Sequence, residues 1–339
     1  VEQPVLEAVL QRAEGGEGVG QDESIDGGRR KRCMARRDRQ ARTGSRAQCR
    51  VPIGPEPKPG ITRPPLTTTT RRSETRYPTR IVCLTEETTE ALYLLGEEDR
   101  IVGISGFTVR PPRARKEKPK VSAFTSAKID RILALEPDLV LGFSDLQADI
   151  ASQLIRHGVE VHVFNQRSVD EILRVIRMLG GMVGCETKAA ALAAELENGL
   201  DALRATAAAF PRRPRVYFEE WDEPQISGIR WVSELVGIAG GDDVFPELAA
   251  CGLGKDRIIT DPLEVVRRAP DIIFGSWCGK KFSARNVAAR PGWHDVPAVR
   301  ERELHEVKSS IILQPGPAAL TDGVRELQRV IAAWAAKRG

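Results

Sequence analysis

One stretch of this sequence occurs twice, and this repeat limits the possible folds more than any other feature. Residues 131–143 read Arg-Ile-Leu-Ala-Leu-Glu-Pro-Asp-Leu-Val-Leu-Gly-Phe, and residues 264–276 read Glu-Val-Val-Arg-Arg-Ala-Pro-Asp-Ile-Ile-Phe-Gly-Ser, 133 positions later. Each copy predicts a helix, a Pro-Asp turn and a buried strand that ends near a glycine. One repeat at this distance is too long for a solenoid and indicates two similar α/β lobes. The alternative is that a common α/β element arose twice by chance.

Short apolar strands alternate with helices around the first copy. Arg80–Leu84 predicts a strand, Thr85 a helix N-cap, and Gly96 the end of that helix. Further strands are expected at 100–105, 138–143 and 159–164, and further helices at 129–135 and 150–157. This alternation is typical of a parallel sheet. A second lobe opens with a strand at 215–218, followed by a polar turn at 219–224.

No strand signal occurs between the two lobes. Residues 168–182 are amphipathic, and residues 186–209 are rich in Ala, Leu and Glu, which favour helix. We therefore expect an α/β fold of two Rossmann-like lobes, bridged by a single long helix, with a ligand cleft between them. The expected boundaries are 80–185 for the first lobe, 186–210 for the bridging helix and 211–339 for the second lobe. Such a bridge would restrict hinge motion.

Residues 1–79 read as a disordered tail or as the product of a mis-set gene start. They carry 16 Lys and Arg against 10 Asp and Glu, whereas the remaining residues carry 35 against 37. The basic excess therefore belongs to a segment without apolar periodicity, and a nucleic-acid role is not supported. The chain begins with Val1 and has no apolar run of 18 residues, no secretory signal and no lipid-anchor cysteine. We expect a cytoplasmic protein or one whose true start is missing.

Aromatic residues cluster where the expected strands end. In open α/β sheets ligands bind at the carboxyl ends of the strands. Five of the 17 aromatic residues lie at such positions, namely Phe107, Phe124, Phe143, Trp221 and Trp277, and Trp231 lies just before an expected helix. Polar candidates at the same kind of position are Thr85, Glu86 and Ser144. An aromatic cleft suits a large, flat, partly apolar ligand. The alternative is that each aromatic side chain caps the core of its own lobe.

Signals for catalysis and for a metal site are missing from the sequence. There is no nucleophile elbow, metalloprotease motif, phosphate-binding loop or dinucleotide fingerprint. The four histidines do not pair at metal-ligand spacing, and the six cysteines include no Cys-x-x-Cys. We expect a protein that is not an enzyme, with no catalytic residues, no bound metal and no catalytic cofactor.

Five segments together resemble the cobalamin and ferric-siderophore substrate-binding proteins of ABC importers, and the resemblance is closest to the cobalamin-binding branch. It runs through residues 80–336 and rests on 80–85, 103–108 with Pro111 and Pro112, 120–124, 134–140 and 240–245. The resemblance implies two α/β lobes joined by one long helix, with the ligand held between them. It also implies that this class of protein works with a membrane permease.

The same resemblance assigns roles to particular residues. Phe124 matches an aromatic residue that faces the corrin, and Thr85–Glu87 and Phe107 match loops of the first-lobe wall. Trp221, Trp231 and Trp277 fall in loops of the second wall. Glu117 and Glu234 lie in the regions where the family presents one glutamate per lobe to the permease.

We therefore expect a monomer that binds a corrinoid, with cobalamin as the first candidate, as part of an ABC-type importer or as a cytoplasmic relative. Basic residues near the expected rims, among them Arg110, Arg115 and Lys280, would also suit an anionic chelate. The alternatives are a ferric-siderophore or haem binder, and a chelatase-like tetrapyrrole enzyme.

Overall fold

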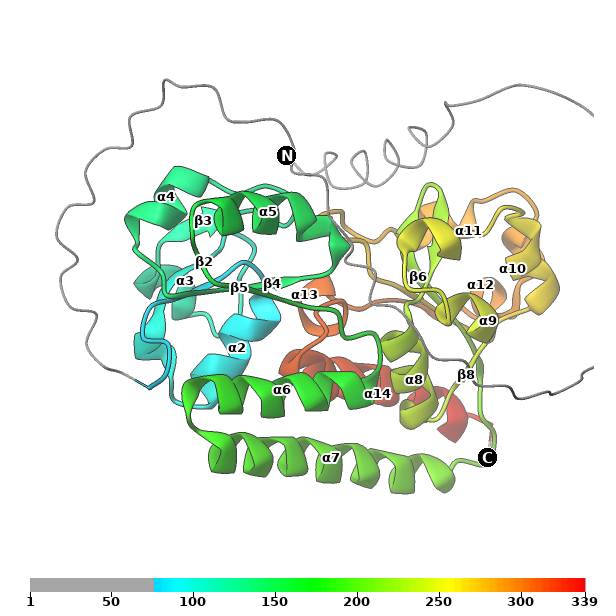
Figure 1. Cartoon of the computed structure of the whole chain (residues 1–339). Helices are drawn as coiled ribbons and strands as arrows, with labels where there is room; N and C mark the ends of the chain where they lie inside the picture. The colour runs from blue at the N-terminus through cyan, green and yellow to red at the C-terminus, as the bar shows by residue number, and fades with distance from the viewer. Residues whose placement is uncertain (1–75, 339) are drawn as a thin grey trace, which may run out of the picture. The chain divides into compact units, whose positions relative to one another are not determined.

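The computed structural model describes residues 76–338 (Figure 1). The expected tail falls almost entirely outside these residues. The last four residues of the expected tail, 76–79, are among the described residues. The Thr79 backbone N–H donates to Asp138 at 2.8 Å, and Arg100 donates to the Pro78 carbonyl. Thr79 and Pro78 thus contact the first lobe. None of the helices within 76–338 combines the length and the apolar character needed to cross a membrane.

The first lobe contains a five-stranded parallel sheet in the order β3-β2-β1-β4-β5. The strands are β1 (Ile81–Cys83), β2 (Ile101–Ser105), β3 (Lys120–Ser122), β4 (Leu139–Phe143) and β5 (Val161–Phe164). The helices are α2 (Glu86–Leu94), α3 (Ala114–Glu117), α4 (Ile129–Ala134) and α5 (Ala148–Arg156). Every strand and helix expected here is present, and β3 and α3 are additional.

The second lobe contains a sheet in the order β10-β9-β6-β7, with β8 also paired to β6. Its strands are β6 (Arg215–Asp222), β7 (Gln225–Ser227), β8 (Asp242–Asp243), β9 (Ile272–Gly275) and β10 (Leu304–Glu306). The helices are α8 (Arg230–Ala239), α9 (Pro246–Ala249), α10 (Leu263–Arg268), α11 (Ala284–Ala288), α12 (Pro297–Arg300), α13 (Ser309–Ile312) and α14 (Val324–Ala336). β7 is antiparallel to β6, because β6 continues through Glu219–Asp222, where a turn was expected, and folds back as a hairpin.

The two copies of the sequence repeat adopt the same local structure. Each consists of a short helix, α4 or α10, followed by a strand, β4 or β9, and the residue before each proline, Glu136 or Ala269, has a positive φ, 46° and 42°. The aspartate after each proline then accepts the backbone N–H at the start of the neighbouring central strand, at 2.8 Å in the first lobe and 2.9 Å in the second. These matching details support the expectation of two lobes built alike.

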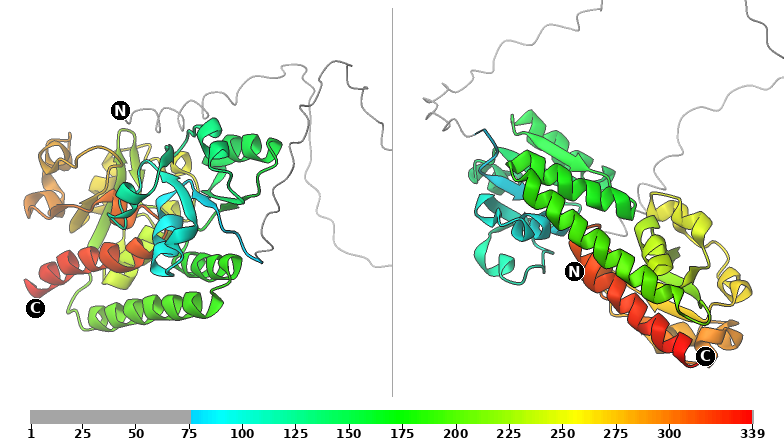
Figure 2. Two further views of the ribbon diagram at one scale, coloured as in Figure 1. Left: turned by 90° about the vertical axis from the view of Figure 1, so that its left-hand side faces the viewer. Right: turned by 90° about the horizontal axis from the view of Figure 1, so that it is seen from below.

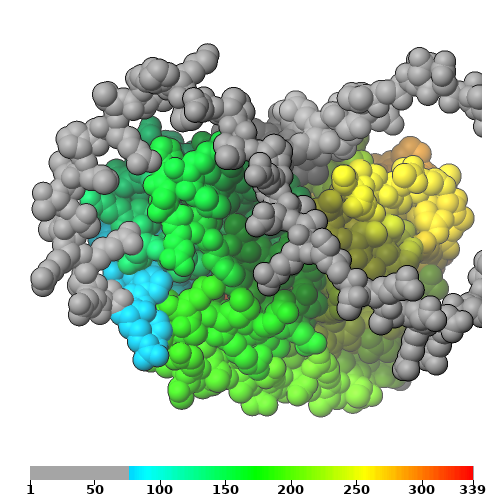
Figure 3. Space-filling model, viewed as in Figure 1, coloured from blue at the N-terminus to red at the C-terminus, as the bar shows by residue number. Residues whose placement is uncertain are grey.

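Two helices, not one, run along both lobes. α6 (Val169–Val183) and α7 (Glu186–Ala208) pack against each other in opposite directions, as Figures 1 and 2 show. In the space-filling view, the green segment that contains them forms the lower part of the visible face (Figure 3). The turn between them needs Gly184, which has φ 75° and lies against the Tyr77 ring, so a side chain there would collide.

α6 and α7 contribute to the cores of both lobes. The start of α6, with Val169 and Ile172, belongs to the second-lobe core, whereas its end, with Leu179 and Val183, belongs to the first-lobe core. The long helix expected at 186–210 is present as α7, and α6 runs beside it and also contributes to both cores. An amphipathic pattern shows that one face of α6 is buried and does not show which core covers it.

Candidate ligand site at the strand exits of the two lobes

The carboxyl ends of the strands of the two lobes approach each other across a connecting segment, residues 313–318. Gln166, which follows β5, donates through Nε2 to the Pro315 carbonyl at 3.0 Å. Gly316 lies so close to Glu87 of α2 that a Cβ added to it would be 2.5 Å from the Glu87 Cβ. Because parallel strands place their loops at one edge, this is where an α/β protein of two lobes can hold a ligand.

The exit of β1 places two buried carboxyl groups at the start of α2. Glu86 and Glu87 are 8% and 3% exposed, and the Thr85 hydroxyl donates to Glu87 Oε1 at 2.6 Å. Burial, with the neighbouring Glu87 charge, raises the pKa of Glu86 to about 8, and burial raises the pKa of Glu87 to about 7. Both carboxyl groups therefore hold protons at neutral pH far more often than exposed glutamates do. A protonated carboxyl group can donate a hydrogen bond as well as accept one.

One turn further along α2, Glu90 connects the two lobes. It accepts Arg110 Nε at 2.8 Å and the Ala318 backbone N–H at 3.0 Å. Arg110 also pairs with Asp322 at 2.8 Å. The sequence predicted Arg110 as a positive charge near the rim of the site. In the structure it bonds to Glu90 and Asp322.

Phe107 and Phe124 are the half-exposed aromatic residues of the first lobe's strand exits. The loop that carries Phe107 is held by Arg115, which donates to the Gly106 and Thr108 carbonyls, both at 2.9 Å. The loop that carries Phe124 is held by Gln147, whose Nε2 donates to the Phe124 carbonyl at 2.9 Å. Both rings therefore sit on loops fixed by side-chain hydrogen bonds.

Ser144 lies at the β4 exit in a conformation that favours glycine. Its φ is 61°, it is 2% exposed, and its Oγ accepts the Leu146 backbone N–H at 3.3 Å. The neighbouring Gln147 Oε1 accepts the Phe143 backbone N–H at 2.9 Å. The Ser144 hydroxyl thus bonds within its own turn, whereas its backbone N–H donates to the Phe164 carbonyl of β5 at 2.8 Å, and both bonds shape the exit of β4.

On the second lobe, Glu219 is the centre of a buried hydrogen-bond network. It is fully buried and receives bonds from Tyr217 at 3.1 Å, from Trp277 Nε1 at 3.1 Å and from both terminal nitrogens of Arg290 at 2.6 and 2.9 Å. Burial alone would lower the pKa of Arg290, but its bonds to Glu219 raise it, so the guanidinium stays charged. This network fixes the Trp277 indole.

Trp221 and Trp277 differ in position and in exposure: Trp277 follows β9, whereas Trp221 lies within β6, next to its last residue. Trp277 is 4% exposed and packs edge-on against Phe282, whereas Trp221 is half-buried and donates to the Glu223 carbonyl at 2.9 Å. The Lys280 ammonium lies 5.8 Å from the Trp221 ring and 5.2 Å from the Trp277 ring, and it pairs with Asp222 at 2.6 Å. Trp221 therefore presents more surface for a ligand than Trp277 does.

Two positions expected in strand-exit loops lie elsewhere. Trp231 is the second residue of α8, 3% exposed within the second-lobe core, and its Nε1 donates to the Ile312 carbonyl at 2.9 Å. The expectation that it lines the wall from a loop is therefore wrong. Trp221, also expected in a loop of the second wall, lies within β6, next to the last residue of that strand.

Two arginines near the strand exits were not expected from the sequence. Arg257 is 1% exposed and pairs with both oxygens of Glu220, at 2.6 and 3.0 Å, and it also donates to the Ser227 carbonyl. Arg167, after β5, lies over the Phe143 ring at 4.8 Å. A charged residue in an expected loop looks like a solvent-exposed one, so no pattern in the sequence distinguished either of them.

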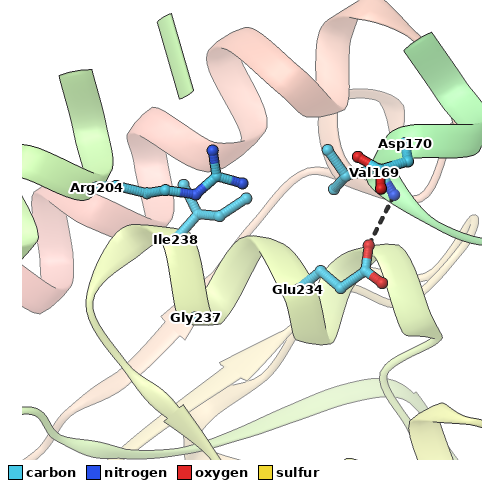
Figure 4. Close-up of a pocket in the computed structure, with 6 residues that line it drawn as sticks. All are labelled: Val169, Asp170, Arg204, Glu234, Gly237 and Ile238. Carbon is cyan, nitrogen blue, oxygen red and sulfur yellow. Dashed lines mark hydrogen bonds between the residues drawn. The ribbon is translucent and has the colours of Figure 1, made fainter. Parts of the chain in front are cut away.

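The two candidate docking glutamates are engaged within the chain. Glu117 accepts the Tyr93 hydroxyl at 2.9 Å and remains 42% exposed. Glu234 accepts the Val169 backbone N–H at 2.7 Å and pairs with Arg230 at 2.8 Å. Glu234 also lines a surface depression of about 360 Å³ between α6, α7 and α8, together with Asp170 and Arg204 (Figure 4). This depression is lined by helices and not by strand exits.

A group of three or more potential metal ligands is not found within residues 76–338. His157 and His294 are exposed, and His305 bonds to Glu303 at 2.9 Å. His162 lies within β5 against Phe164. These positions provide no metal centre among the described residues.

Comparison with known proteins places this architecture in a family. Residues 81–310 match the family model described as periplasmic binding protein. A vitamin B12-binding protein of Vibrio parahaemolyticus is 25% identical over 245 residues, which cover 71% of this chain and 85% of that protein.

Two solved structures share the fold. The periplasmic vitamin B12 binding protein BtuF of Vibrio cholerae superposes with a TM-score of 0.61 at 21% identity, over 76% of this chain and 98% of that one. The periplasmic haem-binding protein RhuT of Roseiflexus sp. RS-1 superposes with a TM-score of 0.64 at 24% identity, over 74% and 98%. The resemblance and the two-lobed α/β fold expected from the sequence are confirmed. The chain belongs to the periplasmic binding protein family, a class of substrate-binding proteins of ABC transporters.

Proposed function

We propose that this protein binds a corrinoid, with cobalamin as the first candidate, between its two lobes and delivers it to an ABC permease. The observation that carries the proposal is the placement of half-buried aromatic rings at or near the carboxyl ends of strands in both lobes. Phe107 and Phe124 lie on the first lobe and Trp221 on the second. Rings on opposing walls suit a broad, flat ligand with apolar faces. The similarity to vitamin B12-binding proteins supports the same ligand class.

The proposed role is binding without catalysis. The carboxyl groups at the β1 exit and the Glu219 network are bonded within the chain, and none of them forms a nucleophile-and-base pair with a described histidine. A chelatase-like reaction would need a group that handles the pyrrole protons. We therefore propose that the ligand is released unchanged, and that the protein acts as a monomer with one ligand.

The second candidate ligand class is haem or a ferric siderophore. Solved relatives include the haem-binding RhuT, and a protein of Staphylococcus epidermidis described as a possible iron-binding (periplasmic solute-binding) protein superposes with a TM-score of 0.66 at 21% identity. The positive charges of Arg167 and Lys280 between and beside the walls favour a ligand that carries negative charge.

Intrinsic fluorescence of the full chain tests the proposal, because Trp221 and Trp277 lie at the strand exits. The protein is titrated with cobalamin, cobinamide, haem and a ferric siderophore, and calorimetry repeats each titration to remove optical artefacts. Saturable binding of cobalamin with one ligand per chain, tighter than that of haem and the siderophore, is the expected result. A chain that binds haem or the siderophore at least tenfold more tightly would replace the corrinoid with the second candidate.

A further inference from the structure

Arg167 combines partial burial with a lack of hydrogen-bonding partners. Its side chain is 19% exposed, and its closest carboxylate contact is Asp145 at 3.9 Å, too long for a hydrogen bond. Within residues 76–338 no hydrogen bond to its guanidinium is found, although the group has five N–H donors. One face lies on the Phe143 ring, 4.8 Å from its centre. A sheltered guanidinium without an acceptor is costly unless something else supplies one.

Two of the three acidic groups near Arg167, Glu220 and Glu171, already bond to other partners. Glu220 holds Arg257 through both oxygens. Glu171 accepts the backbone N–H groups of Arg167 and Ser168 at 2.6 and 3.2 Å. Asp145 is 59% exposed to solvent. Burial, only partly offset by these carboxylates, lowers the pKa of Arg167, although a guanidinium remains charged at neutral pH.

Other arginines at the strand exits bond to carboxylates or backbone carbonyls through their guanidinium groups, although the Arg257 Nε is buried without a partner among the described residues. Arg290 bonds twice to Glu219, Arg257 twice to Glu220, and Arg115 to two backbone carbonyls. Arg110 pairs with Glu90 and Asp322. These four arginines therefore hold the site together, whereas the guanidinium of Arg167 stays available.

The backbone around Arg167 is fixed from both lobes. The Gln166 amide reaches Pro315, Ser168 and Glu171 form a capping box at the start of α6, and the Val169 N–H donates to Glu234 of α8. The Gln166 Oε1 is buried without a partner among the described residues. Arg167 is thus held at the β5 exit before any ligand arrives, which reduces the entropy lost on binding.

We propose that Arg167 binds an anionic group of the ligand, a phosphodiester or a carboxylate, at the point where the two lobes meet. This inference rests on the proposed function and narrows it, because the ligand must then carry a negative charge at its periphery as well as a flat body. Arginine presents two parallel N–H groups to such an oxyanion. Cobalamin offers the phosphodiester of its nucleotide loop, and haem offers two propionates.

The test uses two pairs of ligands, and in each pair one member carries the anionic group and the other lacks it. Cobalamin is compared with cobinamide, which lacks the nucleotide loop and its phosphodiester, and haem is compared with its dimethyl ester. Arg167→Gln should weaken binding of the anionic member of the pair about 10- to 100-fold, the range for losing a charged hydrogen bond. The other member should bind Arg167→Gln and the wild type within about twofold. Arg167→Lys, which keeps the charge, should recover part of the loss.

Arg131→Gln is the matched control, since Arg131 lies on α4, is exposed and undergoes the same change of charge. It should alter neither ligand pair, and thermal unfolding of both variants should match that of the wild type. Equal weakening of both members of a pair would mean that Arg167 attracts the lobes to each other and would overturn the inference. Unchanged affinity would overturn it while leaving the proposed function intact. If the wild type binds none of the four probes, both the proposed function and this inference fail.

Discussion

Phe124 and Trp277 illustrate how burial separates a ligand contact from a core contact. Phe124 is half-exposed on a loop, and the Gln147 side chain holds its carbonyl and not its ring. Trp277 is 4% exposed, packs on Phe282 and donates to Glu219. Although both residues follow a strand, we therefore expect Phe124 to contribute to the free energy of ligand binding and Trp277 to the free energy of unfolding.

Replacing each ring by alanine should separate these roles. Phe124→Ala should weaken cobalamin binding by about 1–3 kcal/mol, the scale of one buried apolar contact, and should change the free energy of unfolding by less than about 1 kcal/mol. Trp277→Ala should lower the free energy of unfolding by about 3–5 kcal/mol through the cavity it leaves. Urea unfolding and ligand titration measure both quantities. The opposite pattern, with Phe124→Ala destabilised and Trp277→Ala fully stable, would contradict this assignment.

Glu86 gives stability a dependence on pH. Its folded-state pKa of about 8 exceeds the usual value of 4.5 because of burial and the neighbouring Glu87 charge, while Glu90 adds to the shift and Arg115 opposes it. The folded state then holds more protons than the unfolded state between pH 4.5 and 8. Stability should therefore fall as the pH rises through this window and should level off above it.

Glu86→Gln removes the charge and nearly preserves the shape. This variant should be more stable than the wild type at pH 8.5, by an amount on the order of a few kcal/mol, and should differ much less at pH 5. Urea unfolding at the two pH values measures the effect, with exposed Glu195→Gln as the control. A wild type whose stability rises between pH 5 and 8.5 would show that the Glu86 carboxyl is not held protonated.

At the scale of the element, the start of α6 holds the junction of the lobes. Ser168 Oγ accepts the Glu171 N–H at 3.2 Å, and the Glu171 carboxylate accepts the Ser168 N–H, also at 3.2 Å. Ser168→Ala should lower the free energy of unfolding by about 1 kcal/mol, the usual loss for an N-cap. Because the same turn positions Arg167, the variant should also bind cobalamin less tightly. Ser126→Ala, a change of the same kind at an exposed loop position, should do neither.

The periodic elements could be predicted from the sequence because their signals are local. A segment of 13 residues contains the signals for the helix, the Pro-Asp turn and the buried strand, and both copies adopt the expected elements. The start of α8 was misplaced because its N-cap is Ile229, which offers no side-chain oxygen as a start signal. α13 is only four residues long and is too short to show a helical period.

The candidate site could be predicted only in part. Position after an expected strand selected Thr85, Glu86, Phe107 and Phe124 as candidates, because parallel strands bring their exits to one edge. Trp221 was selected in the same way, but it lies within β6. Arg257 and Arg290 differ from Arg167 because each bonds to a glutamate, and these glutamates lie 37 and 71 positions away in the sequence. Contacts of this range depend on tertiary packing, which a single sequence does not reveal.

At the scale of the whole molecule, the shared helices should make residues 76–338 unfold as one unit. Val169 and Ile172 at one end of α6 belong to one core, and Leu179 and Val183 at the other end belong to the other. Calorimetry should show one transition whose calorimetric and van't Hoff enthalpies agree. Ile172→Ala and Leu179→Ala, one facing each core, should each destabilise that single transition by about 2–5 kcal/mol. Two separate transitions, each sensitive to one substitution, would show that the lobes unfold independently.

The two lobes have similar architectures but present different side chains at equivalent strand ends. An equivalent hydrogen bond to an aspartate, Asp138 or Asp271, fixes the start of β1 and of β6. The carboxyl ends of these two strands therefore occupy equivalent positions in the two lobes. Yet the β1 exit presents carboxyl groups inclined to hold their protons, whereas the β6 exit presents an indole ring beside an ammonium group. A disc-shaped molecule between them would meet unlike chemistry above and below. Turning it over would exchange those partners, so such a pair of walls selects which side of the disc faces which lobe.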